Sequence, residues 1–301
     1  MKKVLPALLA LTALLVVTGV WAIQPRAEVS PEIPEAPSAA EVVRLTRFQG
    51  KKITGVSTGG AFQVEVVKVA DDSQNRAVVE IDADLEPYLE LEIDAEGVVR
   101  LGWKRTDQTL FRSGRNRTMK MTLYLNELSR VTLAGSGSIS VPDPNTTFTG
   151  TKITARVTGS GRIRNLVFRG DSAEIESTGS GSVHMTTYTR EIYAKGSGSG
   201  RSDLTCYDTE YAKVTVSGSG GITIRGEAQR ADLSSSGSGT LRGDEFKVKR
   251  ANARAVGSGG IRIWAEESLE GSVSGSGGLR YKGNPRQLNV SKSGSGSVRT
   301  L

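Results

Sequence analysis

The sequence predicts an all-β protein in which short repeats stack in parallel to form a single-chain β-solenoid. A Gly-Ser-Gly triplet recurs nine times at nearly constant spacing. Apolar and polar residues alternate on both sides of each triplet, and the repeats show no convincing helical period. Glycine contributes 36 of the 301 residues and aromatic residues only 5 %, so we expect a narrow interior of small side chains.

The triplets divide residues 131–301 into repeats of similar length. Their first glycines are separated by 24, 20, 19, 20, 19, 20, 18 and 19 residues. A flexible linker would cluster its glycines, whereas a fixed short period with alternating sequence between the triplets indicates a solenoid. We therefore assign a corner of the solenoid to each triplet, and the first glycines of these corners are Gly135, Gly159, Gly179, Gly198, Gly218, Gly237, Gly257, Gly275 and Gly294.

The flanks of each triplet predict half-buried strands. The residues four and six positions before and after the first glycine are mostly small or branched apolar residues, and those between them are mostly polar. We expect these positions to face inward, including the sixth position before the last triplet, Leu288. The sixth position after the first glycine of each triplet holds Val141, Asn165, Met185, Leu204, Ile224, Gly243, Ile263, Tyr281 and Thr300.

Each repeat is therefore expected to contain a strand, a Gly-Ser-Gly corner, a second strand and a polar turn. Glycine at the corner permits a positive φ and a close approach of successive rungs. About nine rungs, each about 4.8 Å high, would make a rod on the order of 40 Å long.

Residues 45–130 are less regular but rich in strand-forming sequence. We expect strands within 62–69, 77–81, 89–93, 98–103 and 119–125. Because an end rung exposes unpaired backbone groups, we interpret this part as irregular early rungs that cap the solenoid. A separate small domain is the weaker alternative.

Residues 1–22 resemble an export signal, with Lys2 and Lys3 ahead of an apolar run and small residues before a cleavage position after Ala22. The alternative is a retained anchor, in which case residues 4–23 would be the only membrane contact. Residues 23–44 form a Pro-rich linker ahead of the domain at 45–301. We therefore expect the folded part to lie outside the cytoplasm.

Composition excludes several kinds of chemistry. A single cysteine, Cys206, and a single histidine, His184, exclude a disulfide framework and a Cys/His zinc cluster. The triplets match neither the dinucleotide fingerprint nor the nucleophile elbow. The candidate calcium ligands occupy different repeat positions and form no column; they are Asp171, Asp203, Asp208, Asp232 and Asp244. We expect no catalytic residue, cofactor or metal, and the protein is predicted not to be an enzyme.

One outward position suggests a binding surface. The fifth residue after the first glycine of the triplet is arginine in four successive repeats, at Arg242, Arg262, Arg280 and Arg299. Such an anion-binding ladder would suit an acidic polysaccharide or the phosphates of lipopolysaccharide. The alternative is a solvated row that discourages aggregation, neutralised by nearby acids; those acids are Glu227, Asp244, Glu266 and Glu270. The net charge is +7, but the sequence contains no long run of residues with the same charge, so we expect no nucleic-acid partner.

The repeats resemble a known bacterial family. The segments that carry the resemblance are 217–228, with its Gly-Ser-Gly companions, then 275–285 and 294–298, and the opening segments 60–64 and 125–137. Over residues 45–301 the chain is similar to the putative auto-transporter adhesin head GIN domain family. The resemblance implies a right-handed parallel β-helix related in shape to pectin lyases, a bacterial extracytoplasmic location and an adhesive role. It brings no catalytic residues to this sequence.

The leading hypothesis is a non-enzymatic protein of the periplasm or outer surface that acts in adhesion or envelope interaction. A carbohydrate-active enzyme of the polysaccharide lyase type and a purely structural envelope protein are the alternatives. The sequence stops soon after the last triplet, so we also expect a homo-oligomer through the C-terminal end, unless Lys282 and Arg286 keep the protein monomeric.

Overall fold

The computed structural model describes residues 41–104 and 117–301. In these residues the secondary structure consists of β-strands and two single-turn 3-10 helices, η1 (Asp72–Gln74) and η2 (Glu86–Tyr88). The predicted signal at 1–22 and nearly all of the Pro-rich linker lie outside the described residues and remain predictions. Within the described ranges, no helix is long and apolar enough to cross a membrane.

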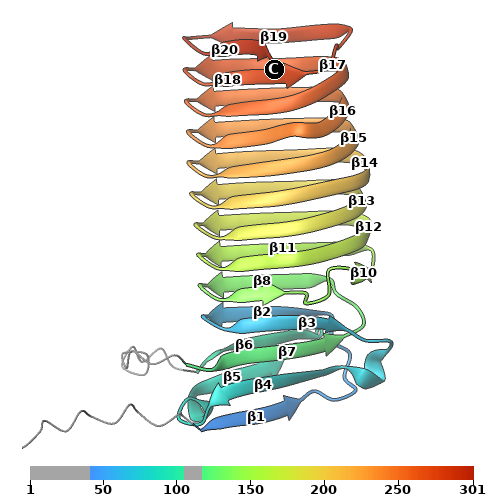
Figure 1. Cartoon of the computed structure of the whole chain (residues 1–301), viewed down its shortest axis with the longest axis vertical. Helices are drawn as coiled ribbons and strands as arrows, with labels where there is room; N and C mark the ends of the chain where they lie inside the picture. The colour runs from blue at the N-terminus through green and yellow to red at the C-terminus, as the bar shows by residue number, and fades with distance from the viewer. Residues whose placement is uncertain (1–40, 105–116) are drawn as a thin grey trace, which may run out of the picture. The chain divides into compact units, whose positions relative to one another are not determined.

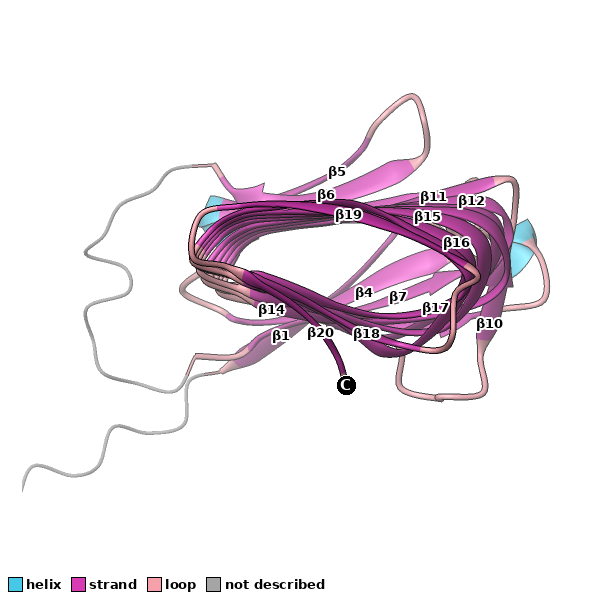
Figure 2. Ribbon diagram, turned by 90° about the horizontal axis from the view of Figure 1, so that it is seen from above, coloured by secondary structure: helices cyan, strands magenta, loops and turns pink. Residues whose placement is uncertain are grey.

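The repeats form a stack of rungs with a flattened oval cross-section (Figures 1 and 2). In the middle of the stack, one long strand runs from each triplet, around the narrow end opposite the corners, to the next triplet. Each long strand pairs in parallel with its neighbours in the stack. These strands are β12 (Arg162–Gly179), β13 (Ser182–Gly198), β14 (Arg201–Gly218), β15 (Gly221–Gly237), β16 (Thr240–Gly257) and β17 (Gly260–Gly275).

Shorter strands complete both ends of the repeat region and define its two long sides. The leading side consists of the residues that precede each triplet, and the trailing side consists of those that follow it. On the leading side lie β8 (Arg130–Gly135), β11 (Lys152–Gly159) and β19 (Gln287–Ser293). On the trailing side lie β9 (Ser138–Ser140), β18 (Gly278–Lys282) and β20 (Ser297–Thr300), while β10 (Thr147–Thr149) pairs with β12. The all-β parallel solenoid predicted from the sequence is confirmed.

The corners repeat one hydrogen-bonding pattern. The first glycine of every triplet has a positive φ, between 89° at Gly237 and 121° at Gly135. Except in the last two triplets, its carbonyl oxygen accepts two hydrogen bonds from the next triplet, as Gly135 does from the N–H groups of Ser160 (2.9 Å) and Gly161 (2.8 Å). A Cβ atom on Gly159 would lie 2.7 Å from the carbonyl oxygen of Gly135. Glycine is therefore required both for the left-handed backbone and for the close stacking of rungs.

The inward positions form one continuous apolar core, as the alternation predicted. Ile153, Ala155 and Val157 of β11, for example, are fully buried. The prediction is wrong at Asn165, which is exposed with a φ of 57°, because a register shift between Ile163 and Leu166 turns its side chain outward.

The expectation is also wrong at Leu288 in β19, whose exposed fraction is 49 %, and at Thr300 in β20, which is exposed. β19 pairs with β17 on one edge, and no described strand pairs with its other edge. The inward face of this last rung is therefore not covered from above.

The N-terminal part contains rungs that are stacked out of chain order. β2 (Gly55–Gly60) pairs in parallel with both β6 (Val98–Trp103) and β8, and β3 (Gln63–Lys68) pairs with both β7 (Met119–Leu125) and β9. The later strands β6 and β7 therefore lie below the earlier strands β2 and β3 (Figure 1). Sequence reasoning identified strands here but not this order.

Antiparallel strands cover the first rung. β1 (Val42–Arg47) pairs with β4 (Arg76–Asp82), β4 pairs with β7, and β5 (Leu89–Ile93) pairs with β6. These pairings use backbone groups that a parallel stack would leave unpaired at its end. Ala40–Leu301 form one compact unit, and the apolar core continues from the repeats into this cap.

One corner has no Gly-Ser-Gly triplet. Gly60 is paired with Gly135, has a φ of 83°, and accepts hydrogen bonds from the N–H groups of Ser136 (2.9 Å) and Gly137 (3.0 Å). Phe62 stands where the second glycine of a triplet would be, and its buried ring stacks on Trp103 with centroids 4.8 Å apart. In the sequence, this corner is marked by the Gly59-Gly60 pair, which lies between two segments of alternating apolar and polar residues.

Candidate functional site

The four predicted arginines stand in register on the trailing side. Arg242 pairs with Arg262, Arg262 with Arg280, and Arg280 with Arg299. Arg242 and Arg262 are half-buried, and Arg280 and Arg299 are exposed. Since neighbouring parallel strands are about 4.8 Å apart, the guanidinium groups rise from the sheet at nearly the spacing of the rungs.

Only one member of this arginine column has an acidic partner. Arg262 Nη1 lies 3.5 Å from Asp244 Oδ2. In the part of the chain that the structure describes, no ion pair or side-chain hydrogen bond involves Arg242, Arg280 or Arg299. Glu227, Glu266 and Glu270, which the sequence offered as neutralising residues, form no ion pair with the column. Three of its four charges are therefore uncompensated.

A second column widens this basic area. Trp264 is paired with Lys247 on one neighbouring rung and with Lys282 on the other. The Nζ atoms of Lys247 and Lys282 lie 4.8 and 5.9 Å from the centroid of the Trp264 ring. Together the two columns make what we call the basic surface, which comprises Arg242, Lys247, Arg262, Trp264, Arg280, Lys282 and Arg299.

Sequence reasoning missed this second column because a β-bulge hides it. The register shifts between Gly243 and Lys247, so Lys247 is opposite Trp264 although the two residues stand at different distances from their triplets. Counting from the triplet aligns Trp264 with Lys282 but not with Lys247.

A hollow lies between the arginine column and the corners. It has a volume of about 290 Å³, and Arg262, Arg280 and the serines Ser258 and Ser276 are among the residues that line it. The outward position next to the corner is glycine at 260 and 278, so no side chain fills this space on those two rungs. Guanidinium and hydroxyl groups thus face one small space.

Part of the leading side offers a contrast, because the charges that β11, β12 and β13 carry there neutralise each other. Arg156 lies 3.5 Å from Glu174 and 2.7 Å from Glu176, and Lys195 lies 3.8 Å from Glu176. A hydrogen bond from Lys152 lowers the pKa of Glu174, against the opposing effect of partial burial. Neighbouring acids therefore compensate these cations, in contrast to three of the four arginines of the arginine column.

The other residues singled out from the sequence do not assemble into a catalytic or metal site. Cys206 is buried, and burial raises the pKa of its thiol to about 12. His184 is exposed and stands opposite Asp203. Among the described residues, no group of three or more His, Cys, Asp or Glu side chains could hold a metal ion. The first glycines of the triplets shape the backbone of the corners and offer no side chain to a ligand.

Comparison with protein families gives one match. Residues 53–285 match the family described as "Putative auto-transporter adhesin, head GIN domain". No curated protein matches the chain.

Several solved structures share the fold at low sequence identity. A "putative adhesin" from Parabacteroides merdae has 17 % identity and a TM-score of 0.64, covering 88 % of this chain and 97 % of its own. A "putative adhesin" from Parabacteroides distasonis has 19 % identity and a TM-score of 0.64, with 87 % and 98 % covered. A "putative lipid binding protein" from Parabacteroides distasonis has 21 % identity and a TM-score of 0.62, with 86 % and 96 % covered.

Proposed function

Because this chain belongs to the putative auto-transporter adhesin, head GIN domain family, we propose that it is a non-enzymatic protein of the bacterial envelope or surface that binds an acidic polysaccharide through its basic surface. The same surface would bind the phosphates of lipopolysaccharide. The observation that carries this proposal is the unbroken register from Arg242 to Arg299 in which three arginines lack an acidic partner.

The geometry suits a polymer better than a small ligand. A row of like charges on adjacent strands is unfavourable unless an anion compensates it. Guanidinium groups bind carboxylate and phosphate oxygens in a bidentate manner, and a row of them matches a chain that repeats its own anionic groups. Four rungs offer such a chain a contact about 15 Å long.

Two further observations support a location outside the cytoplasm. Residues 1–22 have the pattern of an export signal, and residues 24–40 have the composition of a semi-rigid spacer. Proteins of the same fold include ones named "putative adhesin", and adhesion is a role at a surface.

Binding to purified polysaccharides tests the proposal. The protein is titrated with a polyuronate, with lipopolysaccharide and with neutral dextran at low and high salt. We expect salt-sensitive binding to the anionic polymers and none to dextran, because screening weakens exposed charge contacts. The triple variant R242S/R262S/R280S is expected to bind at least about tenfold more weakly, since each charge-assisted hydrogen bond contributes about 1.5–3 kcal/mol.

A matched variant controls for net charge. The substitutions K249S/R250S/R254S remove three exposed cations from the same strand, β16, outside the basic surface. If this variant weakens binding as much as the arginine variant, the basic surface is not the site. Mass spectrometry of the polymers after incubation tests the lyase alternative, because cleavage would show an enzyme. If no polymer binds, a purely structural envelope role becomes the better explanation.

A further inference from the structure

A second groove lies on the leading side, at the other end of the protein from the basic surface. The β5–β6 hairpin stands outside the long side of the oval (Figure 2), and a groove of about 460 Å³ lies between its turn and strands β2, β8 and β11. We call it the hairpin groove. Its lining includes Asp94 and Arg100 from the hairpin, and Ser57, Arg130, Thr132 and Thr154 from the side of the stack.

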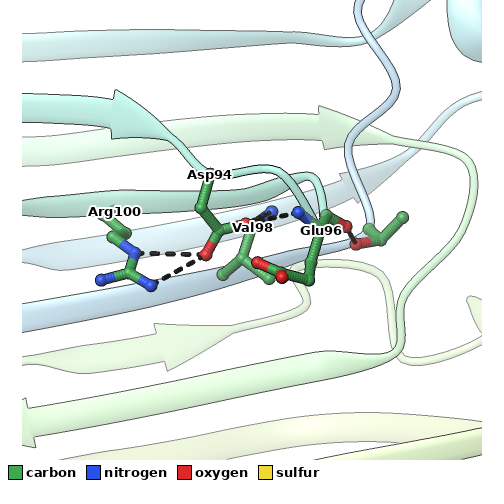
Figure 3. Close-up of polar contacts among 5 residues, drawn as sticks. Asp94, Glu96, Val98 and Arg100 are labelled. Carbon is green, nitrogen blue, oxygen red and sulfur yellow. Dashed lines mark hydrogen bonds and ion pairs between the residues drawn. The ribbon is translucent and has the colours of Figure 1, made fainter.

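The hairpin wall is held in one conformation by Asp94 (Figure 3). Oδ1 of Asp94 accepts hydrogen bonds from the N–H groups of Glu96 (3.1 Å) and Val98 (2.9 Å), which closes the turn. Oδ2 accepts two from the Arg100 guanidinium, at 3.2 and 3.0 Å. Partial burial acts to raise the pKa of Asp94, but the hydrogen bonds from Val98, Arg100 and Glu96 outweigh it and the pKa is lowered. Arg100 is thereby held against Asp94 in the wall of the groove.

The floor of the groove is rich in hydroxyl groups. Ser57 on β2 is paired with Thr132 on β8. On the next strands outward, Arg100 of β6 is paired with Ser57, and Arg156 of β11 is paired with Thr132. In the neighbouring column Arg130 lies between Gly55 and Thr154, so no side chain crowds it from below. The hydroxyls of Ser57, Thr132 and Thr154 are half-buried, and none makes a side-chain hydrogen bond within the described residues. They are free to bind a ligand.

The charge of the groove is positive. Four cationic and two anionic side chains line it, since Lys152, Arg156 and Glu174 complete the lining. Lys152 lies 2.9 Å and Arg156 lies 3.5 Å from Glu174, and Arg100 is paired with Asp94. Arg130 is exposed and forms no ion pair with any other described residue. One uncompensated guanidinium thus stands beside three unpartnered hydroxyls.

We propose that the hairpin groove is a second, independent binding site for a compact oxyanion carried by a sugar, either a phosphate monoester or a carboxylate. Arg130 supplies the charge, Ser57, Thr132 and Thr154 donate hydrogen bonds to the anion or to sugar hydroxyls, and Arg100 borders the site from the hairpin. The volume suits a single sugar unit, whereas the basic surface suits a polymer. The inference does not depend on the function proposed above.

Titration calorimetry with small probes tests this site. The protein is titrated with glucose 6-phosphate, with glucuronate and with glucose. We expect the charged sugars to bind with a Kd on the order of 1 mM and glucose not to bind. The tighter of the two charged probes identifies the oxyanion. Absence of binding by both at about 20 mM would overturn the proposal.

Three variants locate the binding. R130Q is expected to weaken binding at least about fivefold, and T132V, which removes a floor hydroxyl, about twofold or more. R254Q removes an exposed arginine from the same side of the solenoid, outside the groove, and is expected to leave binding unchanged. Equal losses in R130Q and R254Q would contradict the assignment. The variant R242S/R262S/R280S is expected to bind the small probes as tightly as the wild-type protein. This result distinguishes a failure of the hairpin-groove proposal from a failure of the proposal for the basic surface.

Discussion

Arg262 Nη1 lies 3.5 Å from Asp244 Oδ2, and this contact is the one ion pair of the arginine column within the described residues. The other carboxylate oxygen of Asp244 is buried and has no hydrogen-bond partner among them. Asp244 therefore holds Arg262 in place and also lowers the positive charge of the basic surface. This dual role makes Asp244 the most informative single position for testing how the surface binds.

Replacing Asp244 with asparagine is expected to strengthen binding of an acidic polysaccharide. The D244N change keeps the shape of the side chain but removes one negative charge from the surface. Affinity at low salt should rise about two- to fivefold, in line with about 0.5–1 kcal/mol for an exposed charge contact, and the gain should shrink at high salt. Asp171, an exposed acid elsewhere, gives the control D171N. A weaker-binding D244N would mean that positioning of Arg262 matters more than charge.

The second glycine of a triplet, its third residue, is expected to tolerate no side chain. A Cβ on Gly220 would collide with the carbonyl oxygen of Gly200 on the neighbouring rung. G220A should lower the free energy of unfolding by about 1–3 kcal/mol, because the rungs must separate locally. S219A, at the exposed serine next to it, should change stability by less than about 0.5 kcal/mol. Denaturant unfolding followed by circular dichroism compares them, and equal stability would refute the close-stacking explanation.

Cys206 is expected to be unreactive in the folded protein. Burial is the main reason that the pKa of its thiol is raised from 9.0 to about 12, and the nearby Thr187 side chain only partly opposes this shift. At pH 8 the thiolate fraction should therefore be about a thousandfold smaller than that of an ordinary cysteine. Labelling with a thiol reagent should be negligible in buffer and rapid in denaturant. Fast labelling of the native protein would show that the middle of the stack opens readily.

Tyr211 is expected to make stability depend on alkaline pH. Its hydroxyl donates a 2.6 Å hydrogen bond to Asp232, which together with partial burial raises the pKa of Tyr211 from 10.0 to about 12. Because the folded-state pKa lies above the unfolded value, the contribution is complete below pH 10 and is lost as the pH rises towards 12.

Solvent screening limits this contribution to less than about 1 kcal/mol. Tyrosinate absorbance during an alkaline titration measures it directly. In D232N the late-titrating tyrosine should titrate earlier than in the wild-type protein, because the negative partner is gone. Titration at an unchanged pH would mean that burial, and not Asp232, sets the pKa.

Much of the repeat region could be predicted because its signals are local. A positive φ at Gly159 and the inward direction of Ile153, Ala155 and Val157 follow from glycine at a corner and from the two-residue period of a strand. The alignment of Arg262 with Arg280 follows equally from the constant repeat length, since equivalent positions stack when every rung has the same register.

Local signals could not predict what depends on contacts between distant segments. The position of β6 and β7 beneath β2 and β3, and the antiparallel strands that cover them, are choices among pairings that the strand pattern permits equally well. The bulge that places Lys247 opposite Trp264 breaks the constant count from the triplet. The hairpin groove exists because Asp94 and Arg130, 36 residues apart, meet across it.

The amino-acid sequence alone thus specified the corners, the inward and outward faces and the arginine column, because backbone sterics and side-chain period act within a few residues. Folding in three dimensions settled the order of the first rungs, the width of the basic surface and the presence of the hairpin groove. These features depend on which strand edges find each other, and that is governed by the burial of one shared core and the pairing of backbone groups at its end.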